Sequence, residues 1–320
     1  MINRALLCYT SFMSSAPLTP LPIFVDTDIG DDIDDALALA LLLCSPEVSV
    51  VGISTVFGDT YLRARLAAYL LQTYGYSAVP VAAGQELPLL LRHRPSGVCQ
   101  AQVLPEKLAL PLSALSGPEL LLQTARMYPG RLTLLCLGPL TNVALALQQE
   151  PKMGSLLQQV FFMGGASRMS RPDWNVRSDA LAAHILLEAQ LPTTMIGLNV
   201  TASCHLQRGD IARLNSAKSP QLHLLSRMIA AWQEHQPWWR SRLPYLHDPL
   251  VVTALCAPQF FRFAPLPIRI LTQGAFAGWT IPRWLQGPTV RAALSVENTQ
   301  ARTWILQRLF ATETEWPQRA

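Results

Sequence analysis

The sequence has few lysines, few cysteines and no long hydrophobic run, although half of its 320 residues are hydrophobic. Its only lysines are Lys107, Lys152 and Lys218, so arginine carries most of the positive charge behind the net +4, and no basic block is present. Such diffuse positive charge does not indicate a nucleic-acid track. The longest unbroken apolar run, residues 36–44, is far shorter than the roughly 20 residues that a membrane-spanning helix needs.

The cysteines are scattered and form no Cys-x-x-Cys pair. They are Cys8, Cys44, Cys99, Cys136, Cys204 and Cys256. This spacing argues against a zinc site or a disulfide framework, and it predicts reduced, mostly buried thiols in a cytoplasmic protein. The first twenty residues contain a mixed run that is too short and too polar for a signal peptide, so residues 1–20 are expected to form a loose N-terminal extension.

Aspartate, by contrast, is concentrated in one stretch near the N-terminus. Within ten positions the chain has Asp26, Asp28, Asp31, Asp32, Asp34 and Asp35. They follow an apolar run at 22–25, which predicts a buried strand, and precede an apolar helical pattern at 36–43. Carboxylates this close raise one another's pKa unless a cation compensates, and hard cations such as Ca²⁺ or Mg²⁺ prefer oxygen ligands. The stretch predicts an acidic metal site at the carboxyl end of the first strand; the alternative is a solvated acidic loop that caps the helix.

Buried strands and helices alternate through the first two hundred residues. Strands are predicted at 22–25, 48–56, 78–83, 132–137, 160–163 and 193–198, and helices at 36–43, 61–74, 119–127, 142–149 and 181–189. This order predicts a single α/β domain, residues 21–320, with a mostly parallel, doubly wound sheet flanked by helices. Ligands of such sheets bind beyond the carboxyl ends of the strands.

Other segments depart from this alternation. Residues 85–116 predict a long irregular connection, a kind of loop that is often functional. After the sixth strand the pattern is mainly helical to residue 258. A hairpin of 266–271 with 279–281 and a closing helix at 301–310 are then expected.

Three kinds of acidic site could explain the aspartate-rich stretch. An EF-hand loop requires glutamate at its twelfth position, where counting from Asp26 gives Leu37, so this alternative fails. A phosphatase of the haloacid dehalogenase type requires a lysine after a later strand, and none of the three lysines follows an apolar strand pattern. The third is the nucleoside hydrolase family, which the stretch resembles. The family's opening motif, Asp-x-Asp-x-Gly-x-Asp-Asp-Ala, matches residues 26–36 with two extra residues between Gly30 and Asp34.

Five later fragments are similar to motifs of the same family and occur in the same order. They are Gly58-Asp59 for Gly-Asn, Leu137-Gly138-Pro139-Leu140-Thr141-Asn142 for Thr-Gly-Pro-Leu-Thr-Asn, Met163-Gly164-Gly165, Asp173-Trp174-Asn175 for Glu-Phe-Asn, and His247-Asp248-Pro249. Any one of them alone is compatible with a turn or a helix cap. Together, at predicted strand and helix ends, they are typical of the family.

The resemblance implies Ca²⁺-dependent hydrolysis of the N-glycosidic bond of ribonucleosides through an oxocarbenium-like transition state. It implies that Asp28 is a metal ligand and the base that activates a metal-bound water. It further implies metal ligands at Asp35, Asp248 and the carbonyl of Leu137, and substrate contacts at Asp34, Asp59, Met163, Asp173, Trp174 and Asn175. Asp26 is expected to orient the loop from behind the ligands, and His247 to protonate the leaving base or pack against it. A homodimer or homotetramer that acts in nucleoside salvage, without nucleic-acid or membrane partners, is also implied.

The two extra residues leave the register of the opening motif open. Alignment forward from Gly30 places Asp32 near the ribose. Alignment backward from the helix favours Asp34 and Asp35 instead, and we adopt it because the helix fixes their geometry. Asp31 and Asp32 then either bulge outward or supplement the metal ligands.

The sequence also leaves alternatives open for the substrate and for the activity. The aromatic side chains of Trp232, Trp238, Trp239 and Tyr245 either stack on the base or pack in the core. Asp59 in place of asparagine indicates an altered riboside, and the sequence does not distinguish purine from pyrimidine. A catalytically silent riboside-binding protein is the main alternative function, ahead of the phosphohydrolase. The retained Asp28 and His247 argue against it, because binding alone requires no base.

Overall fold

The computed structural model describes residues 19–90, 97–107, 110–167, 172–282 and 288–313. The expected N-terminal extension therefore lies almost entirely outside the described residues, and the first strand begins at Leu21. Within these ranges, no helix is both long enough and apolar enough to cross a membrane.

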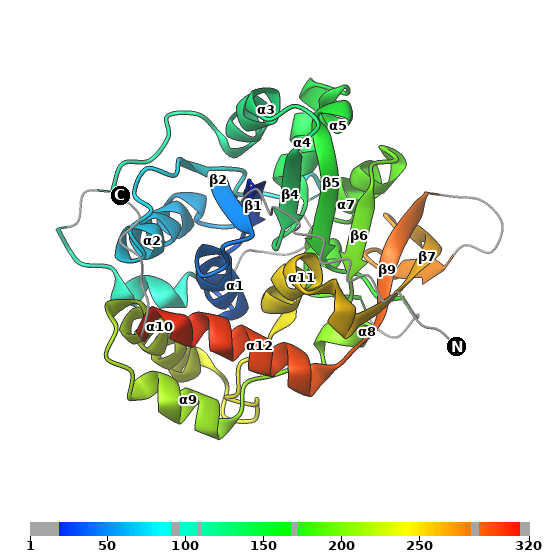
Figure 1. The fold of residues 1–320 in the computed structure, drawn as a ribbon. Coiled ribbons are helices and arrows are strands. Elements are labelled where there is room, and N and C mark those ends of the chain that lie inside the picture. The colour runs from blue at the N-terminus through cyan, green and yellow to red at the C-terminus, as the bar shows by residue number, and fades with distance from the viewer. Residues whose placement is uncertain (1–18, 91–96, 108–109, 168–171, 283–287, 314–320) are drawn as a thin grey trace, which may run out of the picture.

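A mostly parallel sheet forms the centre of the molecule, with its described strands in the order β3-β2-β1-β4-β5-β6-β9-β7-β8 (Figure 1). The strands are β1 (Leu21–Thr27), β2 (Val48–Thr55), β3 (Val81–Ala83), β4 (Leu132–Cys136), β5 (Leu157–Met163), β6 (Thr193–Ile196), β7 (Phe261–Ile270), β8 (Thr280–Pro282) and β9 (Thr289–Val296). Strands β1 to β6 pair in parallel, and β9 continues parallel to β6. β7 pairs antiparallel with β9 and with β8, the latter being the predicted hairpin. The predicted single-domain α/β fold is confirmed.

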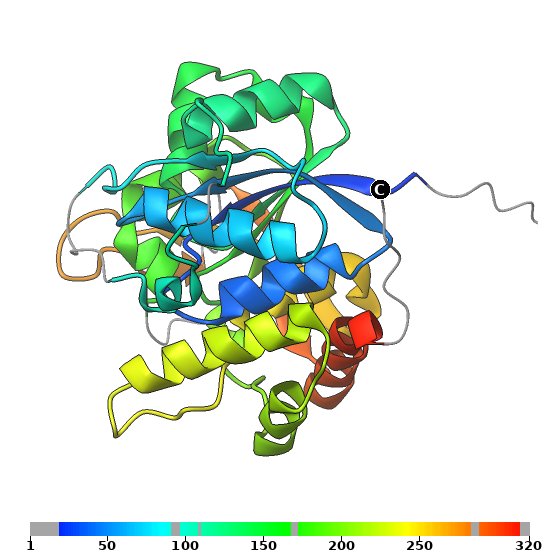
Figure 2. The same ribbon diagram turned by 90° about the vertical axis from the view of Figure 1, so that its left-hand side faces the viewer.

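Helices cover both faces of the sheet, which Figure 2 shows from the side. One face carries α1 (Asp34–Leu43), α2 (Thr60–Thr73), α10 (Pro220–His235), α11 (His247–Cys256) and α12 (Asn298–Phe310). The other carries α3 (Gly117–Met127), α4 (Thr141–Gln149) and α7 (Ala180–Glu188). Shorter elements are α5 (Met153–Leu156), α6 (Trp174–Ser178), α8 (Leu198–Thr201), α9 (Arg208–Asn215), η1 (Cys99–Val103), η2 (Pro258–Phe260) and η3 (Ala311–Glu313).

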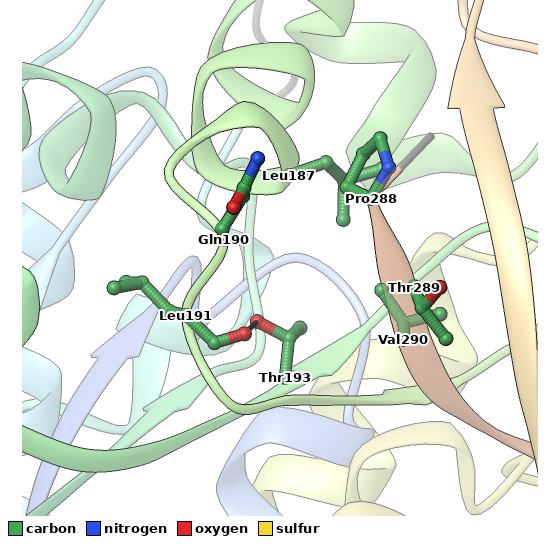
Figure 3. A pocket seen from close by; sticks show the side chains of 7 residues that line it. All are labelled: Leu187, Gln190, Leu191, Thr193, Pro288, Thr289 and Val290. Atoms are coloured by element: carbon green, nitrogen blue, oxygen red, sulfur yellow. Dashed lines mark hydrogen bonds between the residues drawn. The ribbon is translucent and has the colours of Figure 1, made fainter. Parts of the chain in front are cut away.

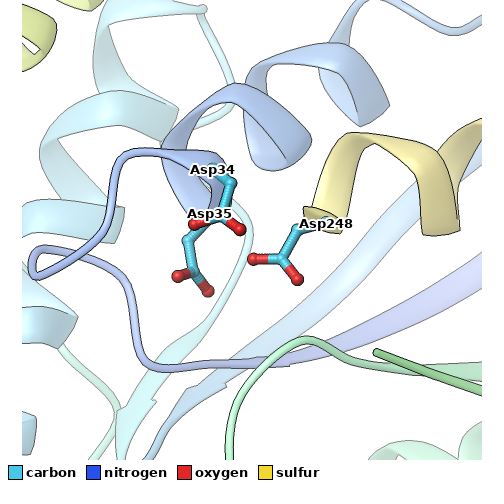
Figure 4. Close-up of side chains that lie close together, drawn as sticks. All are labelled: Asp34, Asp35 and Asp248. Atoms are coloured by element: carbon cyan, nitrogen blue, oxygen red, sulfur yellow. The ribbon is translucent and has the colours of Figure 1, made fainter. Parts of the chain in front are cut away.

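The central strand and the helix after it place the acidic stretch. β1 is buried on both faces, with Ile23 and Val25 in one hydrophobic cluster and Phe24 in the other, as expected for a parallel strand between two helical layers. All ten residues of α1 are buried, and this helix packs against α2, α10, α11 and α12. Because α1 and α11 pack together, their N-terminal residues meet beyond the carboxyl end of β1 (Figure 4).

The structure differs from the predicted elements mainly at the C-terminal edge of the sheet. β9 was not predicted, because its sequence TVRAALSV contains alanine, arginine and serine, which have weak strand preference; pairing on both sides decides its conformation. β7 begins five residues before the expected hairpin strand, and its Pro265 and Pro267 hide it from sequence patterns. The predicted strand at 193–198 ends at Ile196, because α8 begins at Leu198.

Candidate active site

A cavity of about 750 Å³ lies beyond the carboxyl ends of β1, β4 and β5, where ligands were expected. Its acidic lining residues are Asp28, Asp31, Asp32, Asp34, Asp35, Asp173 and Asp248. The remaining lining residues include Leu137, Met163, Trp174, Asn175, Arg177, Trp232, Arg240 and His247. Segments from residue 28 to residue 248 thus converge on one acidic cavity.

A second hollow, of about 270 Å³, lies where β6 and β9 begin, at the opposite edge of the sheet (Figure 3). It is lined by Leu187, Gln190, Leu191, Thr193, Pro288, Thr289 and Val290. None of these side chains is an acid, a base or a good metal ligand. The hollow therefore offers no chemistry for hydrolysis.

Three buried carboxylates form the centre of the acidic cavity. Asp34 and Asp35, at the start of α1, and Asp248, in the first turn of α11, each offer an oxygen atom within 4.8 Å of the others (Figure 4). Burial, and then the neighbouring carboxylates, hold the pKa of Asp34 and of Asp248 well above the usual range. So much like charge in a buried space fits a divalent cation with oxygen ligands. The cluster contains Asp35 and Asp248, two of the three predicted side-chain ligands, and also Asp34, which was expected at the ribose.

Asp35 is held by its own strand. The Thr27 hydroxyl donates to Asp35 Oδ1, and the same hydroxyl oxygen accepts from the Ile29 N–H at 3.1 Å. Burial raises the pKa of Asp35 to about 6, against the opposing effect of the Thr27 bond and the Arg63 charge. The end of β1 therefore fixes this carboxylate toward its two neighbours.

Asp28 lies beside this cluster and lines the same cavity. Burial, followed by the Asp35 charge, raises the pKa of Asp28 well above its usual range, while the Arg63 charge lowers it. A Cβ atom at Gly138 would lie only 2.8 Å from Asp28 Oδ1, so only glycine lets the end of β4 approach this carboxylate. Asp28, predicted as both metal ligand and base, is therefore close to the other predicted ligands, although it is not one of the three clustered carboxylates.

The carbonyl of Leu137, predicted as a metal ligand, accepts a hydrogen bond from Asn175 Nδ2 at 2.5 Å. The same amide donates to the carbonyl of Met163 at 3.2 Å. Asn175 thereby joins the ends of β4 and β5 beside the cavity. The three residues, far apart in sequence, form one wall as expected.

Asp26 lies behind the cavity, fully buried within β1. Its Oδ1 accepts hydrogen bonds from Ser54 Oγ at 2.5 Å and from Asn142 Nδ2 at 2.7 Å. Burial raises its pKa to about 7 in spite of these bonds. Asp26 therefore connects β1 with β2 and α4, consistent with a supporting position.

This shift predicts a pH-dependent stability of the metal-free protein. Because the pKa of Asp26 is about 7 in the folded state and near 3.8 unfolded, the protonated carboxyl is favoured on folding. Its stabilisation is complete below the unfolded value and is lost as the pH rises through 7. Between pH 5 and pH 8 the loss from this group is about 2–3 kcal/mol.

Urea unfolding of the wild type and of Asp26→Asn, both in the presence of a chelator, measures this contribution to the free energy of unfolding. The amide retains an oxygen for Ser54 and Asn142, so the variant is expected to lose about 2–3 kcal/mol less than the wild type between pH 5 and pH 8. Asp210→Asn, on surface helix α9, is the control and should follow the wild type. Identical pH dependence in Asp26→Asn and the wild type would contradict the prediction.

The motif at 173–175, predicted to bind the ribose, lies at the cavity with its acid turned toward the backbone. Both oxygens of Asp173 accept from backbone N–H groups, of Gly165 and of Val176, the latter at 3.1 Å. Its pKa is raised by burial to about 6. Trp174 is 47% exposed on the cavity wall, and its ring meets the Phe57 ring edge-on at 6.2 Å. Asp173 thus positions the loop, and the exposed ring of Trp174 forms part of the cavity wall.

Asp59 lies apart from this cavity. It is exposed, accepts from the Leu62 N–H at 2.9 Å as the N-cap of α2, and lines a different hollow with Gly58, Glu86 and Leu87. The structure thus gives Asp59 a capping contact and does not bring it to the other predicted substrate-binding residues.

His247 lies at the cavity wall, as the first residue of α11. Its Nδ1 lies 2.7 Å from Thr201 Oγ1, and its ring stacks on Tyr245 with the centroids 5.3 Å apart. Trp232 is buried and lines the cavity. Trp238 and Trp239 are exposed and contact each other, and neither lines the cavity. Of the four aromatic candidates, only Trp232 reaches the cavity wall, and Tyr245 supports His247.

Two residues that hold the acidic loop escaped the sequence analysis. Gln100, in η1, donates from Nε2 to the carbonyl of Asp32 at 2.6 Å and from its N–H to the carbonyl of Gly30 at 3.0 Å. Arg63, in α2, is fully buried and binds carbonyls of the same loop. A charged residue inside the apolar stripe of a helix is the one sequence signal that could have identified Arg63; the sequence holds no such signal for Gln100.

Known proteins resemble this chain in sequence and in fold. Residues 23–303 match the model of the family described as inosine-uridine preferring nucleoside hydrolase. The chain is 32% identical over 316 residues to a probable uridine nucleosidase 2 of Arabidopsis thaliana, covering 90% of this chain and 97% of that protein. It is 31% identical over 278 residues to the pyrimidine-specific ribonucleoside hydrolase RihA of Salmonella paratyphi A, covering 82% of this chain and 88% of that protein. The solved structure of a plant nucleoside hydrolase, PpNRh1, matches with a TM-score of 0.83 and 25% identity, over 92% of this chain and all of that chain.

Proposed function

Because this chain belongs to the family of inosine-uridine preferring nucleoside hydrolases and is a ribonucleoside hydrolase, an N-glycosidase, we propose that it cleaves uridine and related pyrimidine ribonucleosides with the help of Ca²⁺. The family membership excludes the phosphohydrolase alternative. The names of the uridine nucleosidase and of the pyrimidine-specific hydrolase support the base preference. The buried cluster of Asp34, Asp35 and Asp248 carries the proposal of a metal.

The three clustered carboxylates, Asp28 beside them and the carbonyl of Leu137 are the oxygen donors that would hold the ion. A hard cation of the Ca²⁺ type fits them because every donor is an oxygen atom and none is nitrogen or sulfur. When bound, the ion would supply positive charge that lowers the pKa of water in the cavity and orients the ribose hydroxyls. Leu137 would then divide its carbonyl lone pairs between the ion and Asn175.

The side chains around the ion would have separate roles in the reaction. Asp28 is placed to take a proton from the attacking water, because it lines the cavity next to the cluster. The carboxylate of Asp34 and the Oδ1 of Asn175 would accept hydrogen bonds from the ribose hydroxyls, because both residues line the cavity. The acidic walls oppose the positive charge that develops on the sugar in an oxocarbenium-like transition state.

A panel of ribosides tests the proposed function. Purified protein is incubated with uridine, cytidine, inosine and adenosine, with Ca²⁺ and with chelator, and released ribose is measured. We expect the highest kcat/KM for uridine and no ribose in chelator. Release from purine ribosides alone would contradict the pyrimidine preference, and no release from any of them would contradict the substrate proposal.

His247 is expected to act on the leaving base. Its replacement by alanine should lower kcat for uridine by about 100-fold, because general acid catalysis contributes about 10²–10⁴. A riboside with 4-nitrophenol as the leaving group needs no proton, so kcat for that substrate should stay near the wild-type value. His205→Ala is the matched control, because His205 also contacts the Tyr245 ring but does not line the cavity. Equal losses on both substrates would indicate that His247 only packs against the base.

A further inference from the structure

Arg63 is a fully buried cation beneath the acidic cavity. It comes from the first turn of α2, directly after the loop that follows β2. Its Nη1 donates to the carbonyls of Asp28 and Ile29, the latter at 2.9 Å, and its Nε donates to the carbonyl of Phe57 at 2.7 Å. One side chain therefore binds the main chain of two separate loops.

The guanidinium forms no ion pair with a carboxylate among the described residues, and its Nη2 has no hydrogen-bond partner there. A buried charge of this kind is costly unless the surroundings compensate it. Here the compensation comes from carbonyl oxygens and from the acids of the cavity. The Arg63 charge in turn lowers the pKa of Asp28 and of Asp35, against the larger effect of burial. The contacts of Arg63 do not neutralise one particular acid; they fix the two loops whose carbonyls it binds.

The second loop is held in an unusual conformation. Phe57 has a φ of 67°, which is rare for a bulky residue. Its N–H donates to the carbonyl of Gln85 at 2.8 Å, and its carbonyl accepts from Arg63. In this conformation the Phe57 ring meets Trp174 on the cavity wall. Arg63 thus connects the backbone of the predicted base with the residue that supports an aromatic wall of the cavity.

We propose that Arg63 is a positioning residue for the hydrolysis, which holds the backbone of Asp28 and the backbone of Phe57, whose ring contacts Trp174 on the cavity wall. The inference rests on the proposed function, because it needs a substrate in the cavity that Asp28 and Trp174 line. A lysine has one nitrogen atom and cannot reach all three carbonyls with the geometry of the guanidinium fork. A displacement of about 1 Å at a reacting group costs on the order of 100-fold in rate.

The test compares Arg63→Lys and Arg63→Gln with the wild type and with Arg65→Lys. Arg65 lies on the same helix and makes no hydrogen bond or ion pair within the described part of the chain, so its substitution is the matched control. For folded protein, we measure kcat and KM for uridine, and separately the affinity for Tb³⁺ by luminescence sensitised from tryptophan, which requires no catalysis. Trp232 and Trp174 line the cavity and are placed to sensitise the ion.

We expect both Arg63 variants to lower kcat about 100-fold, to raise KM and to weaken Tb³⁺ binding about tenfold, with Arg65→Lys unchanged. Arg63 variants that fold and lose only thermal stability, with kcat, KM and Tb³⁺ affinity retained, would overturn the proposal. Where neither Arg63 variant folds, Phe57→Leu takes its place. That variant keeps the carbonyl but removes the ring against Trp174, so it should raise KM and leave Tb³⁺ affinity intact; an unchanged KM would overturn the inference. A wild type that neither cleaves uridine nor binds Tb³⁺ would contradict the proposed function itself.

Discussion

An Asp28→Ala variant is expected to lose about 10²–10⁴ in kcat for uridine, because a general base contributes an acceleration of this size. The loss should fall on kcat more than on KM, since the carboxylate acts on the attacking water and the three clustered carboxylates would still hold the ion. Steady-state kinetics at saturating Ca²⁺ and Tb³⁺ titration measure the two effects separately.

The matched control is Asp210→Ala, which removes the same side chain from α9, outside the cavity. It should retain the wild-type kcat even if it loses some stability with its capping box and its contact to Arg302. An Asp28→Ala variant that kept wild-type kcat would show that another group takes the proton. A variant that lost Tb³⁺ binding entirely would show that Asp28 acts mainly as a ligand.

Removal of Ca²⁺ should abolish hydrolysis and lower the free energy of unfolding. At a free ion concentration a thousand times Kd, binding to the folded state alone contributes about 4 kcal/mol. Most of this gain should come from relief of repulsion among Asp34, Asp35 and Asp248, which are buried and close together. Thermal unfolding with and without Ca²⁺, alongside ribose release, measures the effect.

Asp248→Asn is the informative variant for the metal. It keeps the shape of the side chain but removes one negative charge from the cluster, so it should bind Ca²⁺ weakly while its metal-free form becomes more stable than that of the wild type. The Ca²⁺-dependent shift in Tm should then shrink, whereas Asp210→Asn should keep the full shift. Hydrolysis that survives exhaustive chelation would show that the reaction needs no divalent ion.

The parts of the site that could be predicted were those tied to a strand end. A run such as residues 22–25 ends in a defined place, and parallel strands bring their carboxyl ends together. Asp28, Leu137 and Met163 therefore share a cavity although they are distant in sequence. Asp59 follows β2 in the same way, yet its carboxylate turns back to cap α2, because a free N–H at a helix start competes for a short acidic side chain.

The direction of these side chains could not be predicted from the sequence, for a similar reason. The motif at 173–175 predicted ribose contacts for its acid, and the structure adds that both oxygens of Asp173 accept hydrogen bonds from backbone N–H groups. Asp34, predicted at the ribose, also lies in the carboxylate cluster. Such choices depend on which partners lie within a few ångströms, and those partners come from other segments of the chain.

Because α1 is buried on all sides, its residues tolerate substitution less well than the exposed residues of the cavity. Each of its ten residues is enclosed, so a change of volume at any of them disturbs packing that α2, α10, α11 and α12 share. Trp174, Arg177 and Arg240 also line the cavity, and all three are exposed. During evolution, or in a directed-evolution library, new substrate preferences should therefore arise from these exposed residues, while substitutions in α1 are eliminated through misfolding.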